Sequence, residues 1–374
     1  MSRTLGKRGA APRRLPVLEA APETKRLIGQ HHPEVHDGAE DLGALDSWDE
    51  EEDFEPSVPP EYAAGFEIRK QNFDNAIGFY APALKTYETD DFSNCGMCSF
   101  VGVSVTGPAC ALQCDHCQAN VLKPMIATTS PERLWEVAQA EAARGSGGLL
   151  ISGGSDRKNV VRLHRFVDTM ARIKQELGMR LLVHVGYADE ELAQGLARAS
   201  VDSVMLDIIG SDDTIREVYH LPWATTDCYR RTLEVLSAHG LPLSPHVVIG
   251  LHWGEIRGEY RALEMIAEFP RQSLVLVGLQ PTAGTPMAHA KGPTPDAMGG
   301  VFREARQRFP STSILLGCER PYGEAKRRTD ELAVKAGLNG IAYPAEGIVR
   351  LAVRLGLQIR RSAMCCSLNF QEFT

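Results

Sequence analysis

The sequence predicts an α/β fold, a (βα)8 barrel of the TIM type. Short apolar runs alternate with amphipathic stretches from about residue 100 to the end of the chain, which is the pattern of repeated βα units and a parallel sheet. Eight such runs can be counted, and eight βα units close naturally into a barrel. The 374 residues are enough for one large barrel with extensions.

The helices between these runs have recognisable starts. Ser130 precedes Pro131 in a good N-cap arrangement, which predicts a helix over residues 131–144, and a second amphipathic stretch covers about 257–267. The eight predicted strands are Phe100–Thr106, Gly148–Ser152, Arg180–Val185, Ser203–Ile209, Leu243–Gly250, Leu274–Leu279, Ser313–Gly317 and Gly340–Tyr343.

The chain before the barrel differs in composition. Residues 1–28 carry seven Lys/Arg and two Asp/Glu, whereas residues 34–61 carry twelve Asp/Glu and no Lys/Arg. Such a segment buries too little apolar surface to offset its ordering entropy, so we predict a disordered extension over 1–62. A transit peptide is the alternative for its basic start, although prolines interrupt it. We expect a lead-in segment over 63–99, the barrel over 100–357 and a short cysteine-bearing tail over 358–374.

Charge and hydropathy exclude some partners. Without the two charged segments the body carries 33 basic and 34 acidic residues, so it has no electrostatic footprint for nucleic acid. No apolar run approaches the roughly 20 residues of a membrane helix. Nine cysteines, unevenly clustered and without a secretory h-region, favour reduced or metal-bound thiols and therefore a cytoplasmic protein.

Three cysteines are concentrated just after the first predicted barrel strand. Cys110, Cys114 and Cys117 are spaced by three and two residues, so one tight loop can direct all three thiols at an iron-sulfur cluster. Electron-transfer clusters are closed by four cysteines, so three indicate an open coordination position of the kind that does chemistry. Three buried or zinc-binding cysteines are the alternative. Barrel active sites lie at the carboxyl ends of strands, where this loop is predicted.

The spacing C-x3-C-x2-C resembles the signature of the radical S-adenosylmethionine (SAM) enzymes. The resemblance implies a [4Fe-4S] cluster whose open iron binds SAM and whose electron releases a 5'-deoxyadenosyl radical. The family usually has an aromatic residue before the last cysteine, where this chain has His116. This departure is mild, because in this family the aromatic ring at that position serves largely for packing.

The resemblance also implies which residues hold SAM. Gly153 and Gly154 match the Gly-Gly stretch that meets the SAM amino group, although Ser155 replaces the frequent Glu. Asp207, at the end of the fourth predicted strand, suits a ribose diol. Ile249 and Gly250 match the strand that packs on adenine. A turn without a ligand is the alternative for the glycines, and a helix or turn cap for Asp207. His184 and His246 are candidates for substrate contact or ordinary interior histidines.

The other cysteines suggest a possible second iron-sulfur cluster. Cys318 follows the seventh predicted strand, and Cys228 stands alone and is expected to be structural. A structural zinc site is an alternative, because a C-x2-C pair with a second pair makes a closed tetrahedral site. A further alternative is that these cysteines bind no metal. The predicted ligands of the second centre are Cys95, Cys98 and Cys318 with Cys365 or Cys366.

From Ser104 to Cys366 the chain resembles the biotin-synthase-related radical SAM proteins, and most nearly the subunits of the two-protein lipoyl synthase. The motifs are SVTGPACALQCDHC, SGGSD, GSDDTIREVYHL and the terminal CCSL. The resemblance implies sulfur insertion into a protein-bound octanoyl chain, with a lipoyl carrier protein, a second synthase subunit and a reductant protein as partners. The alternatives are another radical C–H functionalisation, or a non-catalytic iron-sulfur or zinc protein.

Overall fold

The computed structural model describes residues 54–82, 84, 87–92 and 100–368. Eleven parallel strands form one sheet in the order β11-β1-β10-β9-β8-β7-β6-β5-β4-β2-β3. They are β1 (Ala76–Tyr80), β2 (Phe100–Ser104), β3 (Ile126–Ala127), β4 (Gly148–Ser152), β5 (Arg180–His184), β6 (Ser203–Asp207), β7 (Leu243–Ile249), β8 (Ser273–Gly278), β9 (Ser313–Leu316), β10 (Gly340–Ala342) and β11 (Gln358–Ser362).

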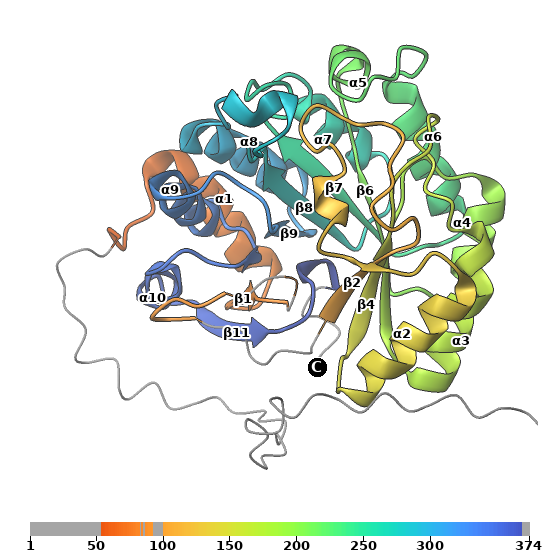
Figure 1. Ribbon diagram of the computed structural model, residues 1–374. Helices are drawn as coiled ribbons and strands as arrows, with labels where there is room; N and C mark the ends of the chain where they lie inside the picture. Colours follow the sequence, from red (N-terminus) through yellow and green to blue (C-terminus); the bar gives the residue numbers. More distant parts are fainter. Residues whose placement is uncertain (1–53, 83, 85–86, 93–99, 369–374) are drawn as a thin grey trace, which may run out of the picture. The chain divides into compact units, whose positions relative to one another are not determined.

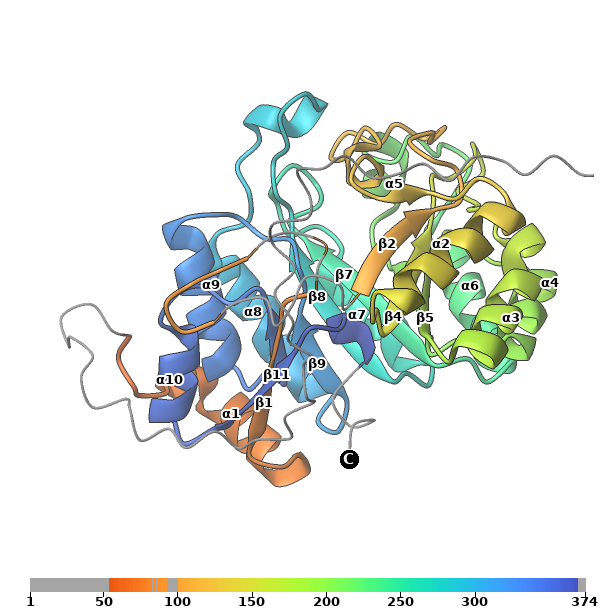
Figure 2. The same cartoon turned by 60° about the horizontal axis from the view of Figure 1, so that its bottom comes forward.

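The sheet curls and helices cover its outer face (Figures 1 and 2). The helices are α1 (Pro60–Asn72), α2 (Pro131–Ala143), α3 (Val167–Leu177), α4 (Glu190–Arg198), α5 (Asp212–Glu217), α6 (Thr226–Ala238), α7 (Glu259–Ala267), α8 (Pro295–Arg308), α9 (Glu324–Lys335) and α10 (Ile348–Arg354), with short 3-10 turns η4 (Asn120–Leu122), η5 (His164–Phe166), η6 (Pro286–His289) and η7 (Cys366–Leu368). None of the described helices is long and apolar enough to cross a bilayer.

The predicted α/β barrel is confirmed, with three additional strands. All eight predicted strands are present as β2 and β4–β10. Strand β1 pairs with β10 and β11, so the lead-in segment and the C-terminal tail both contribute strands to the same sheet. Within the described residues, β3 and β11 are the edges of the sheet, which is therefore an open, curled barrel. The predicted extension is described only over 54–62, where Pro60 begins α1.

Local sequence signals explain where several helices begin and end. The Ser130 hydroxyl accepts a hydrogen bond from the Arg133 amide at the start of α2, as the N-cap pattern predicts. The Asp189 carboxylate accepts a hydrogen bond from the Leu192 amide at the start of α4. Gly178 ends α3 in the left-handed conformation with φ 63°, which glycine adopts without steric cost.

The core on the inner side of the sheet is polar at the amino ends of three central strands. Ser203, Ser244 and Ser273 begin β6, β7 and β8 and are fully buried. Ser203 and Ser273 each donate to the Ser244 hydroxyl, at 2.9 and 2.8 Å, and Ser244 donates to the carbonyl of Ser367 at 3.3 Å. The three hydroxyls therefore satisfy one another and attach η7 to this end of the barrel.

Candidate functional site

The three cysteines of the predicted cluster lie on the loop after β2, which we call the cysteine loop (residues 105–119). Loops from three other strands hold it in place. The Ala111 amide donates to the carbonyl of Ser155 at 2.8 Å, and the Asp115 amide donates to that of Val218 at 3.0 Å. The Met287 amide donates to the Asp115 carbonyl at 3.3 Å. The cysteine loop is therefore fixed from the loops after β4, β6 and β8.

The backbone of this loop is strained. Gln113, Gln118 and Ala119 have φ values of 50°, 48° and 59°, in the left-handed region that residues with a side chain seldom adopt. Such conformations persist where the surrounding structure imposes them, and they concentrate at functional sites. These turns lie next to Cys114 and Cys117 in the sequence.

The thiols are close enough to influence one another's ionisation. Burial raises the pKa of Cys114, and the neighbouring Cys110 and Cys117 raise it further. Burial also raises the pKa of Cys117. A bound metal centre reverses this effect, because a coordinated thiol loses its proton and its charge is neutralised. The three residues therefore fit an iron-sulfur cluster.

The described residues contain no three His, Cys, Asp or Glu side chains that converge as the ligands of a single metal ion must. The thiolates of a [4Fe-4S] cluster bind different irons, so they need not converge on one point.

The predicted Gly-Gly stretch packs directly against the cysteine loop. A Cβ at Gly154 would lie 2.0 Å from the Ala109 carbonyl oxygen and 2.6 Å from the Cys110 Cα. The Gly154 amide donates to the Thr106 hydroxyl at 2.7 Å. Gly153 is also closely packed, since its Cβ would lie 2.9 Å from a Val105 methyl group. The structure thus places both glycines beside the first cysteine, and only glycine fits at position 154.

Asp207 ends β6 and lies beside two histidines. The Nε2 atom of His184, at the end of β5, is 3.7 Å from an Asp207 carboxylate oxygen. The rings of His184 and His246 meet edge to face at 5.6 Å. Burial raises the pKa of Asp207, but His184, with smaller contributions from His246 and His116, lowers it by more, to about 2. Asp207 is therefore an ionised acceptor, as a ribose contact requires.

His246 is held neutral with a fixed tautomer. Its Nδ1 lies 2.9 Å from the Ser244 carbonyl, which only accepts, so Nδ1 carries the proton and Nε2 keeps a lone pair. Burial and the nearby His184 lower the pKa of His246 to about 4. The sequence indicated the two histidines only as isolated residues. That His184, Asp207 and His246 lie together could be predicted only from the register of the strands. In this register His184 pairs with Met205, and Asp207 pairs with His246.

Ile249 and Gly250 can offer a ligand backbone groups, as expected of a strand that packs on adenine. The Ile249 side chain is fully buried, so only its backbone is available. The Gly250 amide already donates to the Glu259 carboxylate at 2.7 Å, and its φ of 74° places it against Pro293. A separate cavity between the ends of β6 and β7, lined by residues such as Val248 and Leu251, has a volume of about 20 Å³, which suits a water molecule.

Two further polar side chains belong to the site's surroundings. The His116 ring stacks near Tyr219 with centroids 5.3 Å apart, and its Nδ1 is buried without a hydrogen-bond partner. His252, by contrast, is held between Thr214 and Arg257 at 3.1 and 2.8 Å. His252 is therefore a structural histidine, whereas His116 retains an unused polar atom beside the cysteine loop.

The other predicted cysteines gather elsewhere in the barrel. Cys365 and Cys366 are buried and Cys318 is half-buried. After burial, Cys318, Cys365 and Cys366 are the main causes that raise the pKa of Tyr343, so all three thiols are near enough to act on its hydroxyl. A hydrogen bond from Cys366 lowers the pKa of Cys365. Cys95 and Cys98 lie outside the described residues, and the ligand set of the second centre stays a prediction.

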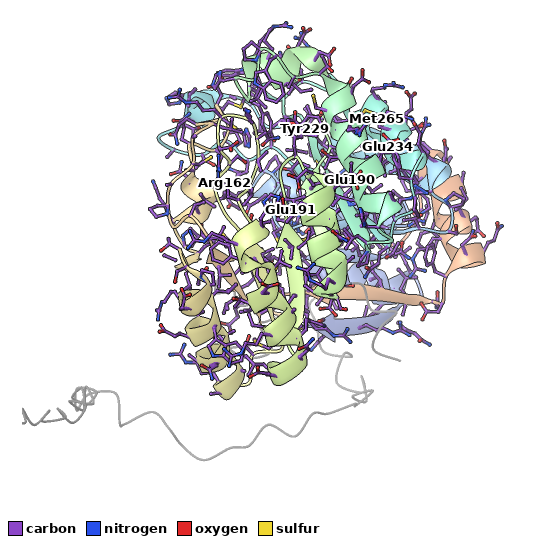
Figure 3. The ribbon with its side chains drawn as sticks, turned by 90° about the vertical axis from the view of Figure 1, so that its right-hand side faces the viewer. Arg162, Glu190, Glu191, Tyr229, Glu234 and Met265 are labelled. Atoms are coloured by element: carbon purple, nitrogen blue, oxygen red, sulfur yellow. The ribbon has the colours of Figure 1, made fainter. Side chains whose placement is uncertain are left out.

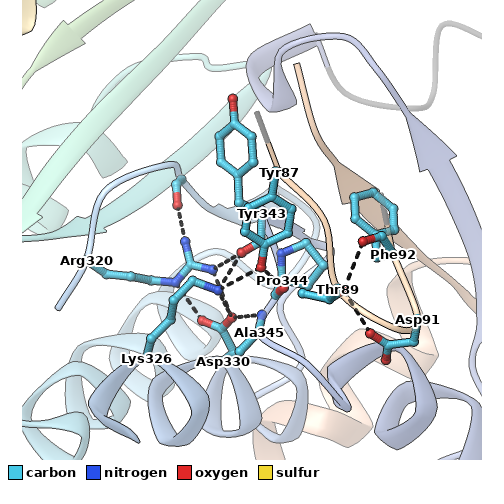
Figure 4. Close-up of polar contacts among 11 residues, drawn as sticks. Tyr87, Thr89, Asp91, Phe92, Arg320, Lys326, Asp330, Tyr343, Pro344 and Ala345 are labelled. Atoms are coloured by element: carbon cyan, nitrogen blue, oxygen red, sulfur yellow. Dashed lines mark hydrogen bonds and ion pairs between the residues drawn. The ribbon is translucent and has the colours of Figure 1, made fainter. Parts of the chain in front are cut away.

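A buried ion pair, which the sequence analysis missed, supports the Cys318 loop (Figure 4). The Arg320 guanidinium binds both oxygens of Asp330, at 2.6 and 2.8 Å, and donates to the carbonyls of Gly317 and Tyr343 at 2.7 and 3.0 Å. The Ala345 amide donates to the same carboxylate at 2.7 Å. This pair fixes the loops after β9 and β10 relative to each other. An Arg–Asp pair ten residues apart carries no signal in a single sequence.

Comparison with known proteins identifies the domain. Residues 104–263 match the model of the radical SAM superfamily. They form a radical SAM domain. Proteins with this domain use a [4Fe-4S] cluster and SAM. The match covers the cysteine loop, the Gly-Gly stretch, Asp207 and the Ile249–Gly250 pair, so the candidate site lies within the domain.

The curated relatives include biotin synthases. The chain is 25% identical to that of Neorickettsia sennetsu over 290 residues, which cover 71% of this chain and 86% of the relative. It is 26% identical to that of Erwinia tasmaniensis over 253 residues, which cover 64% and 70%. These relatives support the biotin-synthase-related subgroup.

Solved structures share the fold at low sequence identity. Methylornithine synthase (PylB) matches with a TM-score of 0.53 at 16% identity, over 80% of this chain and 88% of its own. HydG, a maturase of the [FeFe]-hydrogenase, matches with a TM-score of 0.58 at 13% identity, over 83% and 70%. These similarities support the predicted barrel and do not identify a substrate.

Proposed function

We propose that this radical SAM enzyme inserts sulfur into a protein-bound octanoyl chain, as a subunit of a lipoyl synthase. The observation that carries the proposal is a second group of thiols inside the same barrel as the radical site. His184 lies 3.7 Å from Asp207 and is also close enough to contribute to the lowered pKa of Cys365. The C-terminal cysteines thus share the barrel interior with the proposed SAM-binding carboxylate.

The residues of the first site take separate roles in this proposal. Cys110, Cys114 and Cys117 would hold the [4Fe-4S] cluster, which supplies the electron that cleaves SAM. Backbone groups of Gly153 and Gly154 would meet the SAM amino group, and Asp207 would accept hydrogen bonds from the ribose hydroxyls. The histidine beside Asp207 keeps that carboxylate ionised.

The second group of cysteines would supply the sulfur. Cys95, Cys98 and Cys318, together with Cys365 or Cys366, would hold a second iron-sulfur centre containing sulfide. For each C–S bond formed, one C–H bond would break, its hydrogen would go to 5'-deoxyadenosine, and one SAM would give one methionine. The carbon radical would bond to a sulfide of the second centre, and the irons of that centre would take up the one electron released. The cleavage of each SAM consumes one electron, which a reductant protein would supply. We place the reaction in the cytoplasm, with a second synthase subunit as partner.

The test uses anaerobically reconstituted full-length protein. Dithionite-reduced enzyme with SAM should form 5'-deoxyadenosine, and iron should reach about eight atoms per chain rather than about four. An octanoylated lipoyl carrier domain should gain sulfur, measured as a mass shift of its acyl chain. About four irons would contradict sulfur insertion, and so would deoxyadenosine without any sulfur on the acyl chain when the second synthase subunit is present. Deoxyadenosine with a different mass shift would favour another C–H functionalisation.

A further inference from the structure

Among the described residues, three arginine side chains are fully buried: Arg69 on α1, Arg306 on α8 and Arg320 after β9. Charged side chains of the outer helices instead reach the solvent, for example Glu190, Glu191 and Glu234 (Figure 3). Burying a charge is costly unless an opposite charge accompanies it. Arg320 meets this requirement, because it binds both oxygens of Asp330. Arg69 and Arg306 have no such partner in the described chain.

These two arginines lie close together, between α1, α8 and the turn after α9. The Arg306 Cζ atom is 5.0 Å from the centre of the Phe73 ring, at the end of the helix that carries Arg69. The Gly337 carbonyl accepts from the Arg306 Nε atom at 3.1 Å, and a Cβ at Gly337 would lie 3.1 Å from the Arg69 Cβ. Burial, and after it the charge of Arg69, lowers the pKa of Arg306 to about 9. Two like charges are therefore adjacent.

The hydrogen bonds of this pair go only to neutral acceptors. Arg69 donates from Nη2 to the Ala76 carbonyl, but its Nε and Nη1 atoms are buried and have no partner. These two atoms carry three of the five N–H groups of a guanidinium. Arg306 donates to the carbonyls of Gly337, Phe309, Pro310 and Thr312 and to the side-chain oxygen of Asn339.

The acidic side chain that acts on Arg69 does not bind it. Asp74 raises the pKa of Arg69 against the larger, opposite effect of burial. One Asp74 oxygen accepts from the Ala76 amide at 3.3 Å and the other from the Arg360 guanidinium at 2.6 Å. The Asp74 side chain is also 56% exposed. Within the described chain, the charges of Arg69 and Arg306 are thus left without a bound carboxylate.

We propose that Arg69 and Arg306 bind a small inorganic anion of the size of chloride. The ligand is an anion, because it meets N–H donors and two adjacent positive charges. It is small, because closely packed backbone surrounds the pair: a Cβ at Gly337 would lie 2.6 Å from the Gly65 carbonyl oxygen.

The location of the pair indicates what the anion does. Ala76 begins β1, and Thr312 and Asn339 directly precede β9 and β10, so the pair lies at the amino ends of these strands. The anion joins α1, which leads into the barrel, to α8 of the barrel itself. This role is structural and does not depend on the proposed function, whose residues lie at the carboxyl ends of the strands.

The first experiment measures the thermal stability of the reconstituted full-length protein. Chloride replaces gluconate at constant ionic strength, so general screening does not change. The Tm of the wild type should rise by about 1–3 °C for each tenfold increase in chloride above the Kd, because the ligand binds the folded state. Arg69→Met should remove this dependence. Arg308→Met, which removes an exposed cation from the end of the same α8 helix, should retain it.

Three results would overturn the anion site. The first is an equal Tm of the wild type in chloride and gluconate. The second is an unchanged chloride dependence in Arg69→Met. The third is an equal rise of the Tm with phosphate, which is too large for the packed site, because it would show a general effect of ions on the protein.

A second measurement needs no variant. Wild-type crystals grown with bromide in place of chloride should show an anomalous peak within hydrogen-bonding distance of Arg69 Nε or Nη1. A water molecule or a carboxylate of the chain at this place, without an anomalous peak, would overturn the proposal. Formation of 5'-deoxyadenosine is measured separately: if it fails while the Tm responds to chloride, the anion site stands and the proposed function does not.

Discussion

The two ends of the barrel are built on different principles. Eight non-glycine residues of the described chain have positive φ, and seven of them lie on loops at the carboxyl ends of the strands; Ser200, just before β6, is the exception. The amino end instead has the Ser203–Ser244–Ser273 hydroxyls, all buried and all hydrogen-bonded. Backbone strain is thus concentrated at the end that carries the cysteine loop, and the hydrogen-bonded serines at the other end contribute stability. The predictions below test this division.

Removing a cluster thiol should have the largest effect. In the proposed function Cys114→Ala removes one of the three thiolates of the cluster, so 5'-deoxyadenosine formation should fall to the uncatalysed background while the fold persists. Cys228→Ala, a half-buried cysteine on α6, should keep full activity and serves as the control. Chromatography of reduced, SAM-treated protein measures both. Equal activities would remove the cysteine loop from the mechanism.

A methyl group at Gly154 should displace the cysteine loop. The added Cβ of Gly154→Ala would meet backbone atoms of Ala109 and Cys110 at 2.0 and 2.6 Å, so one of the two loops must shift. We expect a loss of SAM cleavage of about tenfold or more, since small displacements of a reacting group can cost about a hundredfold. Gly300→Ala, in the α8 helix, should leave activity unchanged and stabilise the helix by about 1 kcal/mol. Full activity in Gly154→Ala would show that the close packing is dispensable.

The Arg320–Asp330 pair is an exception to this difference between the two ends of the barrel. It contributes stability at the carboxyl end, which also carries the cysteine loop. Arg320→Met leaves the buried Asp330 with only the more distant Lys326 ammonium, at 3.4 Å, and the Ala345 amide, which should lower the free energy of unfolding by about 3 kcal/mol in urea titrations. Arg320→Met/Asp330→Leu removes the isolated charge and should recover much of this loss. If the double variant is no more stable than the single one, the pair acts through its contacts to Gly317 and Tyr343 rather than through charge.

At the amino end, Ser244 should matter more than its neighbours. Ser244→Ala removes the partner of two buried hydroxyls and of the Ser367 carbonyl, so it should cost about 1–3 kcal/mol of unfolding free energy. Ser203→Ala removes a single donor and should cost less. SAM cleavage per folded molecule should be unchanged in both. Activity that falls before stability does would contradict a purely structural role for this end.

The smallest predicted effect is a pH dependence at His246. Its pKa is about 4 in the folded protein and about 6.5 unfolded, so the unfolded chain binds more protons between these values. This contribution to stability is complete above pH 6.5 and is lost as the pH falls to about 4. Wild-type protein should therefore lose about 1–3 kcal/mol more than His246→Gln between pH 7 and pH 4.5. Equal losses would show that His246 does not titrate as a buried neutral group.

Local signals predicted much of this structure. The eight strands, the N-cap at Ser130 and the proximity of Cys110 to Gly153–Gly154 followed from apolar runs, capping chemistry and the position of both loops at strand ends. Strands β1, β3 and β11 were not predicted. Strand β3 has only two residues and β11 is largely polar, so neither is an apolar run, and β1 becomes a strand through its pairing with β10 and β11. The Asp207–His184–His246 group depends on the register of three strands, and the Arg320–Asp330 pair on the packing of α9. Neither is encoded locally.

The position of β1 has a consequence for how the chain is made. Gly78 pairs with Gly340 and Arg360, so this early strand finds its partners only after most of the chain has been synthesised. At roughly 5–20 residues per second, a ribosome takes roughly ten seconds to a minute to cover that interval. During this time the apolar β1 has unpaired backbone groups, which is the condition that leads to aggregation. Expression at low temperature or with added chaperones should therefore raise the soluble yield more than any change to the finished protein's surface.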